Sequence, residues 1–207
     1  MPSNRPKQAR AIESRRKLLE ATVLALVENG YASTTTARIC EAAGLSQGAL
    51  FKHFPTKAAL MVAAAEHLFQ RVREAFQAAC EAARAEPDRV GGALRLFDRS
   101  FRDPLHLASL ELFVAARNDR GLAEALEPIA LAHREALRRE ASGALGVVPG
   151  DSADADAFVQ LVLSALQGRA VGALAGAGAS SDVGELIALY RLANREFGGS
   201  AGEPQAR

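Results

Sequence analysis

The sequence predicts an all-α protein, and two observations support that fold class. Apolar residues recur at intervals of three and four along most of the 207 residues, which is the spacing of one face of a helix. Hydrophobic residues make up 49% of the chain and only 8 residues are Pro, so the chain can build a large core from helices that few prolines interrupt. We therefore expect one or two helical domains.

The charged residues divide the chain into a basic and an acidic part. Residues 1–57 hold nine Lys or Arg against four Asp or Glu, whereas the remaining residues hold 16 against 20. Basic residues gathered in one part of a chain are typical of a module that binds phosphate groups. The net charge of +1 hides this asymmetry, which predicts a nucleic-acid-binding module joined to a domain that does not touch nucleic acid.

The amino-terminal segment is predicted to be a polar arm followed by one amphipathic helix. Residues 1–8 contain two prolines, and we expect them to be disordered or, through the basic residues Arg5, Lys7 and Arg10, to lie in a minor groove. From about Ala9 to Asn29 the spacing of apolar residues predicts a helix that ends at Gly30. The apolar residues expected to face the core are Ile12, Leu19, Val23, Leu26 and Val27.

Residues 35–54 predict two short helices joined by a tight turn. Thr35 is suited to cap the first helix, Gly44 supplies the left-handed backbone position that ends it, and Ser46 is placed to cap a second helix that runs to His53. This is the arrangement of a helix-turn-helix, in which the first helix braces the second in the major groove of DNA. The residues of the first helix expected on one apolar face are Ile39, Ala42 and Ala43.

The second helix is suited to face DNA. Leu50 and Phe54 have the spacing that packs inward, whereas spacing does not assign Phe51 to either side. The other residues are small or polar and include no acid that would repel phosphate: Gln47, Gly48, Ala49, Lys52 and His53. The alternative, a capped helical pair inside an ordinary core, leaves the exposed polar residues Gln47, Lys52, His53 and Lys57 without an explanation.

These residues carry a resemblance to a known family. The run from Gly30-Tyr31 through Ala42-Ala43-Gly44-Leu45-Ser46 to His53-Phe54 and Thr56-Lys57 resembles the amino-terminal domain of the tetracycline-repressor (TetR) family of bacterial transcription regulators. The resemblance implies that the second helix reads base edges while Thr35, Phe51, His53 and Lys57 hold phosphates. The full set of predicted DNA-binding residues is Thr35, Thr36, Ser46, Gln47, Gly48, Ala49, Phe51, Lys52, His53 and Lys57.

Two positions depart from the pattern of the resembled family. Phe51 stands where tyrosine is usual, so a phenolic contact is missing, and Ala58 stands where an acidic residue is common. We expect the first departure to weaken or redirect one DNA contact and the second to matter little.

We expect two domains with flexible ends. A DNA-binding domain spans residues 9–55 with the helix-turn-helix at about 35–54, a helical ligand-binding and dimerisation domain spans 56–198, and residues 1–8 and 199–207 are flexible termini. Pro128 is expected to kink a helix or to begin a new one. The predicted helices of the second domain are about 56–83, 88–101, 105–117, 121–145, 154–176 and 182–197, with a loop at 146–153.

The last two predicted helices are expected to form a dimer interface. Gly168, Gly172 and Gly176 fall four apart, and such a strip lets a second helix approach closely. A twofold pair of helix-turn-helix units can read two half-sites about 34–36 Å apart. We therefore predict a homodimer through residues 154–176 and 182–197, against the alternative that these helices only cover the monomer core.

The resemblance also implies a small-molecule effector. In the resembled family the second domain encloses a cavity, and an ordinary core position is an equal alternative for each candidate lining residue. The effector itself does not follow from the sequence. The candidate lining residues, mostly apolar with a few polar groups, are Phe97, Phe101, His106, Leu110, Phe113, His133, Phe158 and Gln167.

The sequence contains no recognisable catalytic, metal or cofactor motif. HExxH, GxSxG and phosphate-loop patterns are absent, and the histidines outside the helix-turn-helix are scattered. Cys40 and Cys80 lack a CxxC partner and are expected to be small buried residues, with a thiol sensor as the alternative. No signal peptide or membrane span is expected, so we predict a cytoplasmic protein.

Together these inferences predict a sequence-specific DNA-binding transcription regulator. We expect a repressor that leaves a pseudo-palindromic operator when a small lipophilic effector binds. The alternatives are a DNA-binding adaptor that recruits a protein partner and a small helical enzyme, and activation in place of repression also stays open.

Overall fold

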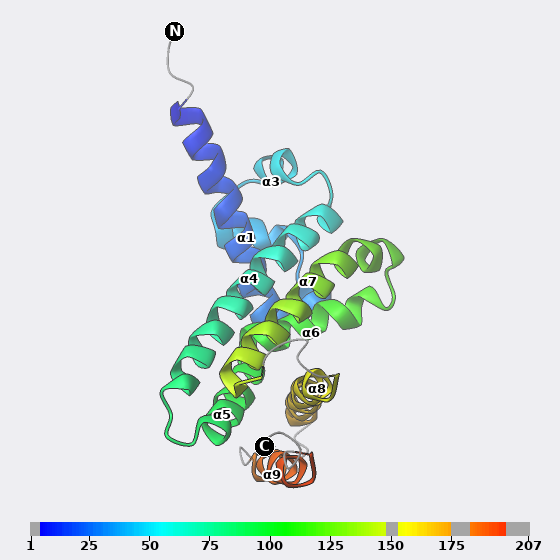
Figure 1. Ribbon diagram of the computed structural model, residues 1–207. Coiled ribbons are helices and arrows are strands. Elements are labelled where there is room, and N and C mark those ends of the chain that lie inside the picture. The colour runs from blue at the N-terminus through cyan, green and yellow to red at the C-terminus, as the bar shows by residue number, and fades with distance from the viewer. Residues whose placement is uncertain (1–4, 148–152, 175–182, 198–207) are drawn as a thin grey trace, which may run out of the picture. The chain divides into compact units, whose positions relative to one another are not determined.

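The computed structural model describes residues 5–147, 153–174 and 183–197, and every element in these ranges is an α-helix (Figure 1). The predicted all-α class is confirmed. The chain forms two compact units, of which unit 1 contains Met1–Ala75 and Asp103–Leu137, and unit 2 contains Phe76–Arg102 and Arg138–Arg207. The predicted division into a DNA-binding domain (9–55) and a ligand-binding and dimerisation domain (56–198) is a division by function, and it stays a prediction.

Unit 1 begins with α1 (Arg5–Ser33), which is longer than predicted. It starts inside the segment expected to be an arm, so Arg5, Lys7 and Arg10 lie on a helix. Its backbone leaves helical geometry at Gly30 (φ 72°, ψ 172°), where the sequence predicted the helix to end. The assignment of Ile12 to the core is wrong, because the buried positions of α1 begin only at Leu18 and Ile12 is 63% exposed.

Five helices contribute to the rest of unit 1. α2 (Thr36–Ala43) and α3 (Gln47–His53) pack with α1, and α4 (Lys57–Arg84) begins in this unit. α6 (Pro104–Ala116) also packs against α1, and α7 (Arg120–Leu145) continues through Pro128, so no new helix begins there. Large side chains from these helices form one core that includes Leu18, Leu26, Ile39, Leu50, Leu60, Leu68, Phe69, Leu112, Leu122 and Leu126.

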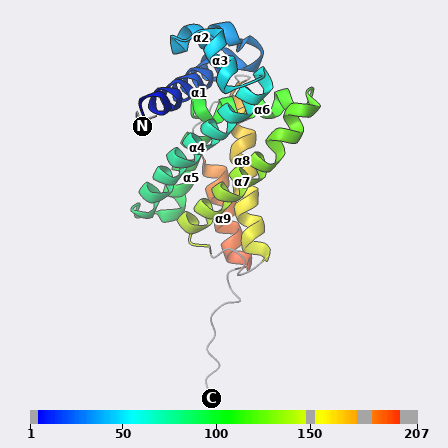
Figure 2. The same cartoon turned by 90° about the horizontal axis from the view of Figure 1, so that it is seen from above.

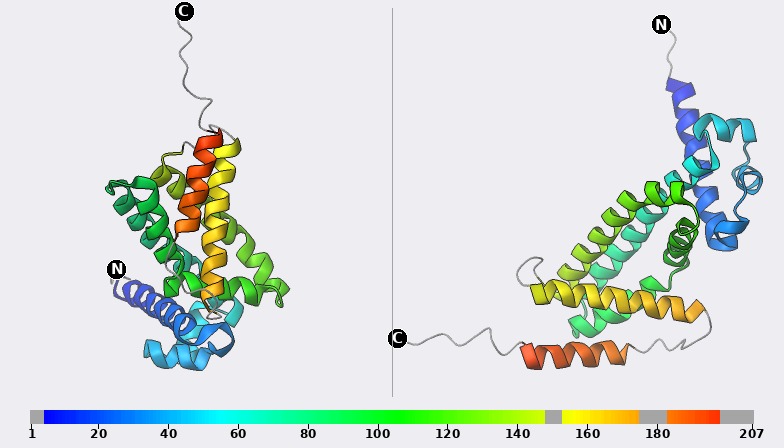
Figure 3. Two further views of the ribbon diagram at one scale, coloured as in Figure 1. Left: turned by 90° about the horizontal axis from the view of Figure 1, so that it is seen from below. Right: turned by 90° about the vertical axis from the view of Figure 1, so that its right-hand side faces the viewer.

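Unit 2 contains α5 (Arg89–Phe101), α8 (Ala153–Leu174) and α9 (Gly184–Phe197), together with the last turns of α4 and α7. Phe76 of α4 packs on Phe97 and Phe101 of α5, with ring centroids 4.8 and 6.1 Å apart. α5 contacts both α8 and α9, which lie side by side in Figures 2 and 3. Gly176 of the predicted contact strip and residues 148–152 of the predicted loop lie outside the described residues.

A buried carboxylate joins α5 to α8. The Asp98 side chain is only 5% exposed and accepts hydrogen bonds from Nε of Arg169 at 3.0 Å and Nε of Arg102 at 2.9 Å. A buried carboxylate depends on its cationic partners, because removing them leaves a negative charge without a counter-charge inside the protein. One face of α8 is thus held inside unit 2 by an ion pair and by the buried residues Val159, Val162, Leu163, Leu166 and Ala170.

Among the described helices, α8 alone is long and apolar enough to cross a membrane by length and composition. A single helix of this kind is weak evidence, since core helices of folded proteins meet the same two criteria. The buried face of α8 and its ion pair with α5 fit such a core helix.

Candidate DNA-binding surface and effector pocket

The caps predicted for the helix-turn-helix are present. Oγ1 of Thr35 accepts a hydrogen bond from the backbone N–H of Arg38 at 3.3 Å, and Oγ of Ser46 accepts one from Ala49 at 3.2 Å. Gly44 ends α2 in the left-handed conformation (φ 63°, ψ 35°), which a glycine adopts without steric cost. These local bonds fix where α2 ends and α3 begins, and so set the turn between them.

α3 presents a face suited to DNA. Leu50 is fully buried and Phe54 is 3% exposed, so these residues attach α3 to the core as predicted. Phe51, which spacing left unassigned, is 44% exposed. Gln47, Gly48 and Lys52 are also exposed, while Ala49 and His53 are half-buried. α3 carries no acidic residue, and its exposed side therefore offers polar and apolar groups without repelling phosphate.

On α2 one predicted core position is wrong. Ala42 is exposed, whereas Cys40 is 5% exposed and packs inward with Ile39. A cysteine of this kind serves as a small apolar residue. The difference arises because α2 has only eight residues and its buried face follows positions 39, 40 and 43.

The start of α4 brings a basic residue to the same part of unit 1. Oγ1 of Thr56 accepts a hydrogen bond from the backbone N–H of Ala59 at 3.0 Å, so Thr56 caps the helix as predicted. Nζ of the half-buried Lys57 lies 5.5 Å from the centroid of the Tyr31 ring, within the range of a cation–π contact. Of the two remaining predicted DNA-binding residues, Thr35 is exposed and Thr36 is half-buried.

Sequence reasoning missed two basic residues near these helices. Nη1 of Arg38, an exposed residue of α2, donates to Oδ1 of Asn29 at 3.2 Å. The guanidinium of Arg15 lies 5.2 Å from the ring centroid of Phe54. Arg38 stands three residues after the cap Thr35, which is a local signal, whereas the pairing of Arg15 with Phe54 spans too much sequence for periodicity to reveal.

Two of the predicted effector residues of unit 1, His133 and Phe113, pack on Phe69 of α4. The His133 ring stacks on Phe69 with centroids 4.7 Å apart, and the half-buried Phe113 lies 5.5 Å from Phe69. Leu110 is 8% exposed. Burial lowers the pKa of His106 to about 4, and burial together with the nearby charge of Arg73 lowers the pKa of His133 to about 4. Both imidazoles are therefore neutral at pH 7 and offer hydrogen bonds without charge.

The remaining predicted effector residues lie in unit 2. Phe97 and Phe101 are buried against Phe76, whereas the half-buried Phe158 packs on Tyr190 with ring centroids 5.4 Å apart. Gln167 is exposed on α8. The structure thus divides most of the predicted pocket residues among three groups of aromatic side chains and leaves Gln167 exposed. Their role in effector binding stays a prediction.

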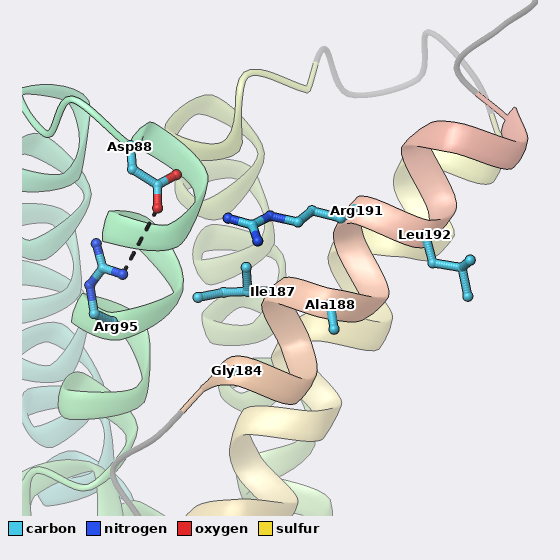
Figure 4. A pocket seen from close by; sticks show the side chains of 7 residues that line it. All are labelled: Asp88, Arg95, Gly184, Ile187, Ala188, Arg191 and Leu192. Atoms are coloured by element: carbon cyan, nitrogen blue, oxygen red, sulfur yellow. Dashed lines mark ion pairs between the residues drawn. The ribbon is translucent and has the colours of Figure 1, made fainter.

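Two surface clefts are lined by other residues. One, of about 620 Å³, lies between α5 and α9 and is lined by Asp88, Arg95, Gly184, Ile187, Ala188, Arg191 and Leu192. Figure 4 shows the Ile187 and Arg191 side chains pointing toward α5, where Arg95 pairs with Asp88 at 3.9 Å. The other, of about 590 Å³, is lined by Glu66, Arg73, Pro128, Ile129 and Ala132. Neither lining includes a predicted effector residue.

The two cysteines are buried as predicted, at 5% and 0% exposure for Cys40 and Cys80. Burial raises the pKa of both thiols, and that of Cys80 to about 12. Because the thiolate is the reactive form, this environment does not favour a redox sensor. Within the described ranges no group of three or more His, Cys, Asp or Glu side chains is arranged to hold a metal ion.

A short second helix that exposes Gln47 and Lys52 and is braced by a capped first helix defines a DNA-binding protein of the helix-turn-helix class. Comparison with known proteins agrees. The model of the tetR family of bacterial regulatory proteins matches residues 18–70. The HTH-type transcriptional regulator CymR of Pseudomonas putida is 32% identical over 173 residues, which are 84% of this chain and 85% of CymR.

The chain therefore belongs to the tetR family of bacterial transcriptional regulators. Solved structures share its fold. A TetR-family regulator from Mesorhizobium loti is similar with a TM-score of 0.66 and 17% identity, covering 91% of this chain and 96% of that one. The multidrug binding protein EbrR in complex with proflavin is similar with a TM-score of 0.62 and 20% identity, covering 86% of this chain and 99% of EbrR.

Proposed function

We propose that this transcriptional regulator is a homodimeric repressor that binds a pseudo-palindromic operator and leaves it when a small lipophilic effector binds. The observation that carries the DNA-binding half is the exposed, acid-free face of α3 beside the capped start of α4. Gln47 and Lys52 would read base edges from this face, and Thr35, His53 and Lys57 would hold phosphates on either side. Such a protein acts on chromosomal DNA and hence in the cytoplasm.

The dimer proposal rests on the outer side of α8 and α9. Their exposed apolar residues are Leu161, Val171, Leu174, Leu189 and Leu192. Gly168 lies seven residues after Leu161, on the same face, and a Cβ at Gly168 would meet no atom within 4 Å. Exposed apolar residues beside an open glycine suit a close helix–helix contact. We propose that twofold mates of α8 and α9 cover it.

The effector proposal rests on the aromatic cluster around Phe69. It combines apolar surface with neutral, buried imidazoles, and Nδ1 of His133 makes no hydrogen bond to any residue the structure describes. A buried polar atom without a partner is unfavourable by about 1–3 kcal/mol, which a ligand hydroxyl or amide would relieve. The structural neighbour EbrR is described as a multidrug binding protein and was solved with proflavin, a flat aromatic compound. By analogy, we propose an aromatic effector.

Selection of bound DNA from a random pool by the purified protein tests the first half of the proposal. We expect enrichment of a sequence with twofold symmetry, and loss of that enrichment when Lys52 and His53 are changed to alanine. The enriched duplex then becomes the probe for a screen of small apolar compounds. If only a protein partner changes operator binding, the protein is an adaptor; if nothing is enriched, operator recognition is wrong.

Two single substitutions distinguish a residue that reads bases from a residue that contacts phosphate. Gln47→Ala should relax preference at one or two base pairs, at a cost of about 1–3 kcal/mol there. Lys57→Ala should weaken binding to all sequences alike and flatten the salt dependence, because it removes a phosphate contact. Unchanged sequence preference in Gln47→Ala would show that another face of α3 reads the bases.

A further inference from the structure

One side chain of α6 holds the backbone of α1 beside its break. Oε2 of Glu111 accepts a hydrogen bond from the backbone N–H of Tyr31 at 2.7 Å. The same carboxylate lies over Gly30, where a Cβ would be 2.5 Å from Oε2. Because the chain leaves helical geometry at Gly30, the Tyr31 amide takes its acceptor from α6, which is 80 residues away in the sequence.

The turn around Tyr31 is fixed from its other side as well. Thr34 is fully buried. Its hydroxyl Oγ1 donates to the carbonyl oxygen of Gly30 at 2.7 Å, and its backbone N–H donates to the carbonyl oxygen of Tyr31 at 3.2 Å. With its amide and its carbonyl both bonded, Tyr31 has little freedom to turn. The hydrogen bonds hold the Tyr31 backbone in place, and its half-buried ring lies under Nζ of Lys57, 5.5 Å from the ring centroid.

We propose that Glu111 is a positioning residue for DNA binding: it fixes Tyr31, and the Tyr31 ring holds Lys57 where it contacts a phosphate. The proposal rests on the proposed function, because it needs Lys57 to be a phosphate contact. Glu111 is the one acidic residue of α6 (Pro104–Ala116), so no neighbouring carboxylate on that helix replaces it. α6 thereby takes part in a DNA contact made by the first residue of α4.

Removing Glu111 should change DNA affinity in opposite directions, depending on whether Glu111 positions Lys57 or only repels phosphate. A carboxylate near a phosphate-binding surface repels DNA, so charge alone predicts tighter binding when Glu111 is removed. Positioning predicts weaker binding for Glu111→Ala. Glu111→Gln removes the charge but keeps an oxygen that can accept the Tyr31 N–H, and it should therefore keep the contact.

The test measures affinity for the selected operator duplex against salt concentration, with full-length variants whose fold is checked by circular dichroism. We expect Glu111→Ala to bind roughly tenfold more weakly, with the slope of log K against log [salt] flatter by about 1 for each half-site. Glu111→Gln should stay within about twofold of the wild type or bind more tightly. The matched control is Glu127→Ala, which removes an exposed carboxylate from α7 in the same unit.

A double-mutant cycle with Lys57 decides whether Glu111 acts through it. In a Lys57→Ala background, Glu111→Ala should change affinity by less than about twofold, because the contact it positions is already gone. Tyr31→Phe should bind like the wild type, and Tyr31→Leu, which removes the ring, should resemble Glu111→Ala. Additive effects in the cycle, or tighter binding by Glu111→Ala, would overturn the proposal while leaving operator binding established. A wild-type protein that binds no operator would instead overturn the proposed function.

Discussion

Phe51 of α3 stands at a position where the resemblance to the TetR family predicts a tyrosine. Its side chain is 44% exposed, so it is available to DNA, but it has no hydroxyl to donate to a phosphate. Phe51→Tyr would supply one. We expect binding to the operator to tighten by about 1 kcal/mol per half-site, and binding to unrelated duplexes to tighten alike, because a phosphate contact carries no sequence information.

Fluorescence anisotropy with the selected operator and with an unrelated duplex of equal length measures both effects. His53→Ala in the same assay is the control for loss of a neighbouring contact. Tightening on one sequence only would place the ring of residue 51 at base edges, where phenylalanine can contact a thymine methyl group.

At the scale of elements, the break in α1 depends on one glycine. Gly30 has φ 72° and ψ 172°, a conformation that costs a residue with a side chain about 1–3 kcal/mol. A Cβ there would also displace the Glu111 carboxylate. We therefore expect Gly30→Ala to lower the free energy of unfolding by at least about 2 kcal/mol and, through Glu111, to weaken operator binding.

Urea denaturation followed by circular dichroism measures the stability change. Gly121→Ala is the matched control, since Gly121 is an exposed residue of the first turn of α7 and a Cβ there would make an ordinary 3.6 Å contact with Asp119. That variant should be neutral or more stable by about 0.5–1 kcal/mol. Equal effects of the two substitutions would show that the backbone at Gly30 relaxes without strain.

The elements differ in how far the sequence alone predicts them. The caps Thr35, Ser46 and Thr56 bond to amides three residues ahead, so local patterns were sufficient. Glu111 meets Tyr31 from 80 residues away, and no periodicity of α6 marks it. The prediction of burial failed at Ile12 because spacing gives the face of a helix but not where its neighbours begin to cover that face. At Ala42 it failed because the eight residues of α2 are too few for spacing to decide between Ala42 and Cys40.

For the molecule as a whole, the exposed apolar side of α8 gives the sharpest test of assembly. Leu161 is 51% exposed on α8, and Leu131 is 53% exposed on α7. The two leucines are matched in exposure, but only Leu161 shares a face with Gly168. A carboxylate buried in an apolar interface without a partner is strongly unfavourable, so Leu161→Glu should raise the dissociation constant of the dimer by roughly a hundredfold or more.

Sedimentation velocity over a range of concentrations measures this dissociation, and operator binding should fail in the same concentration range, because two half-sites need two helix-turn-helix units. Leu131→Glu should stay dimeric and keep its operator affinity. The opposite pattern, with Leu161→Glu dimeric and Leu131→Glu monomeric, would move the interface from α8 to α7. A wild-type monomer that still selects a twofold-symmetric sequence would mean that DNA itself brings the two copies together.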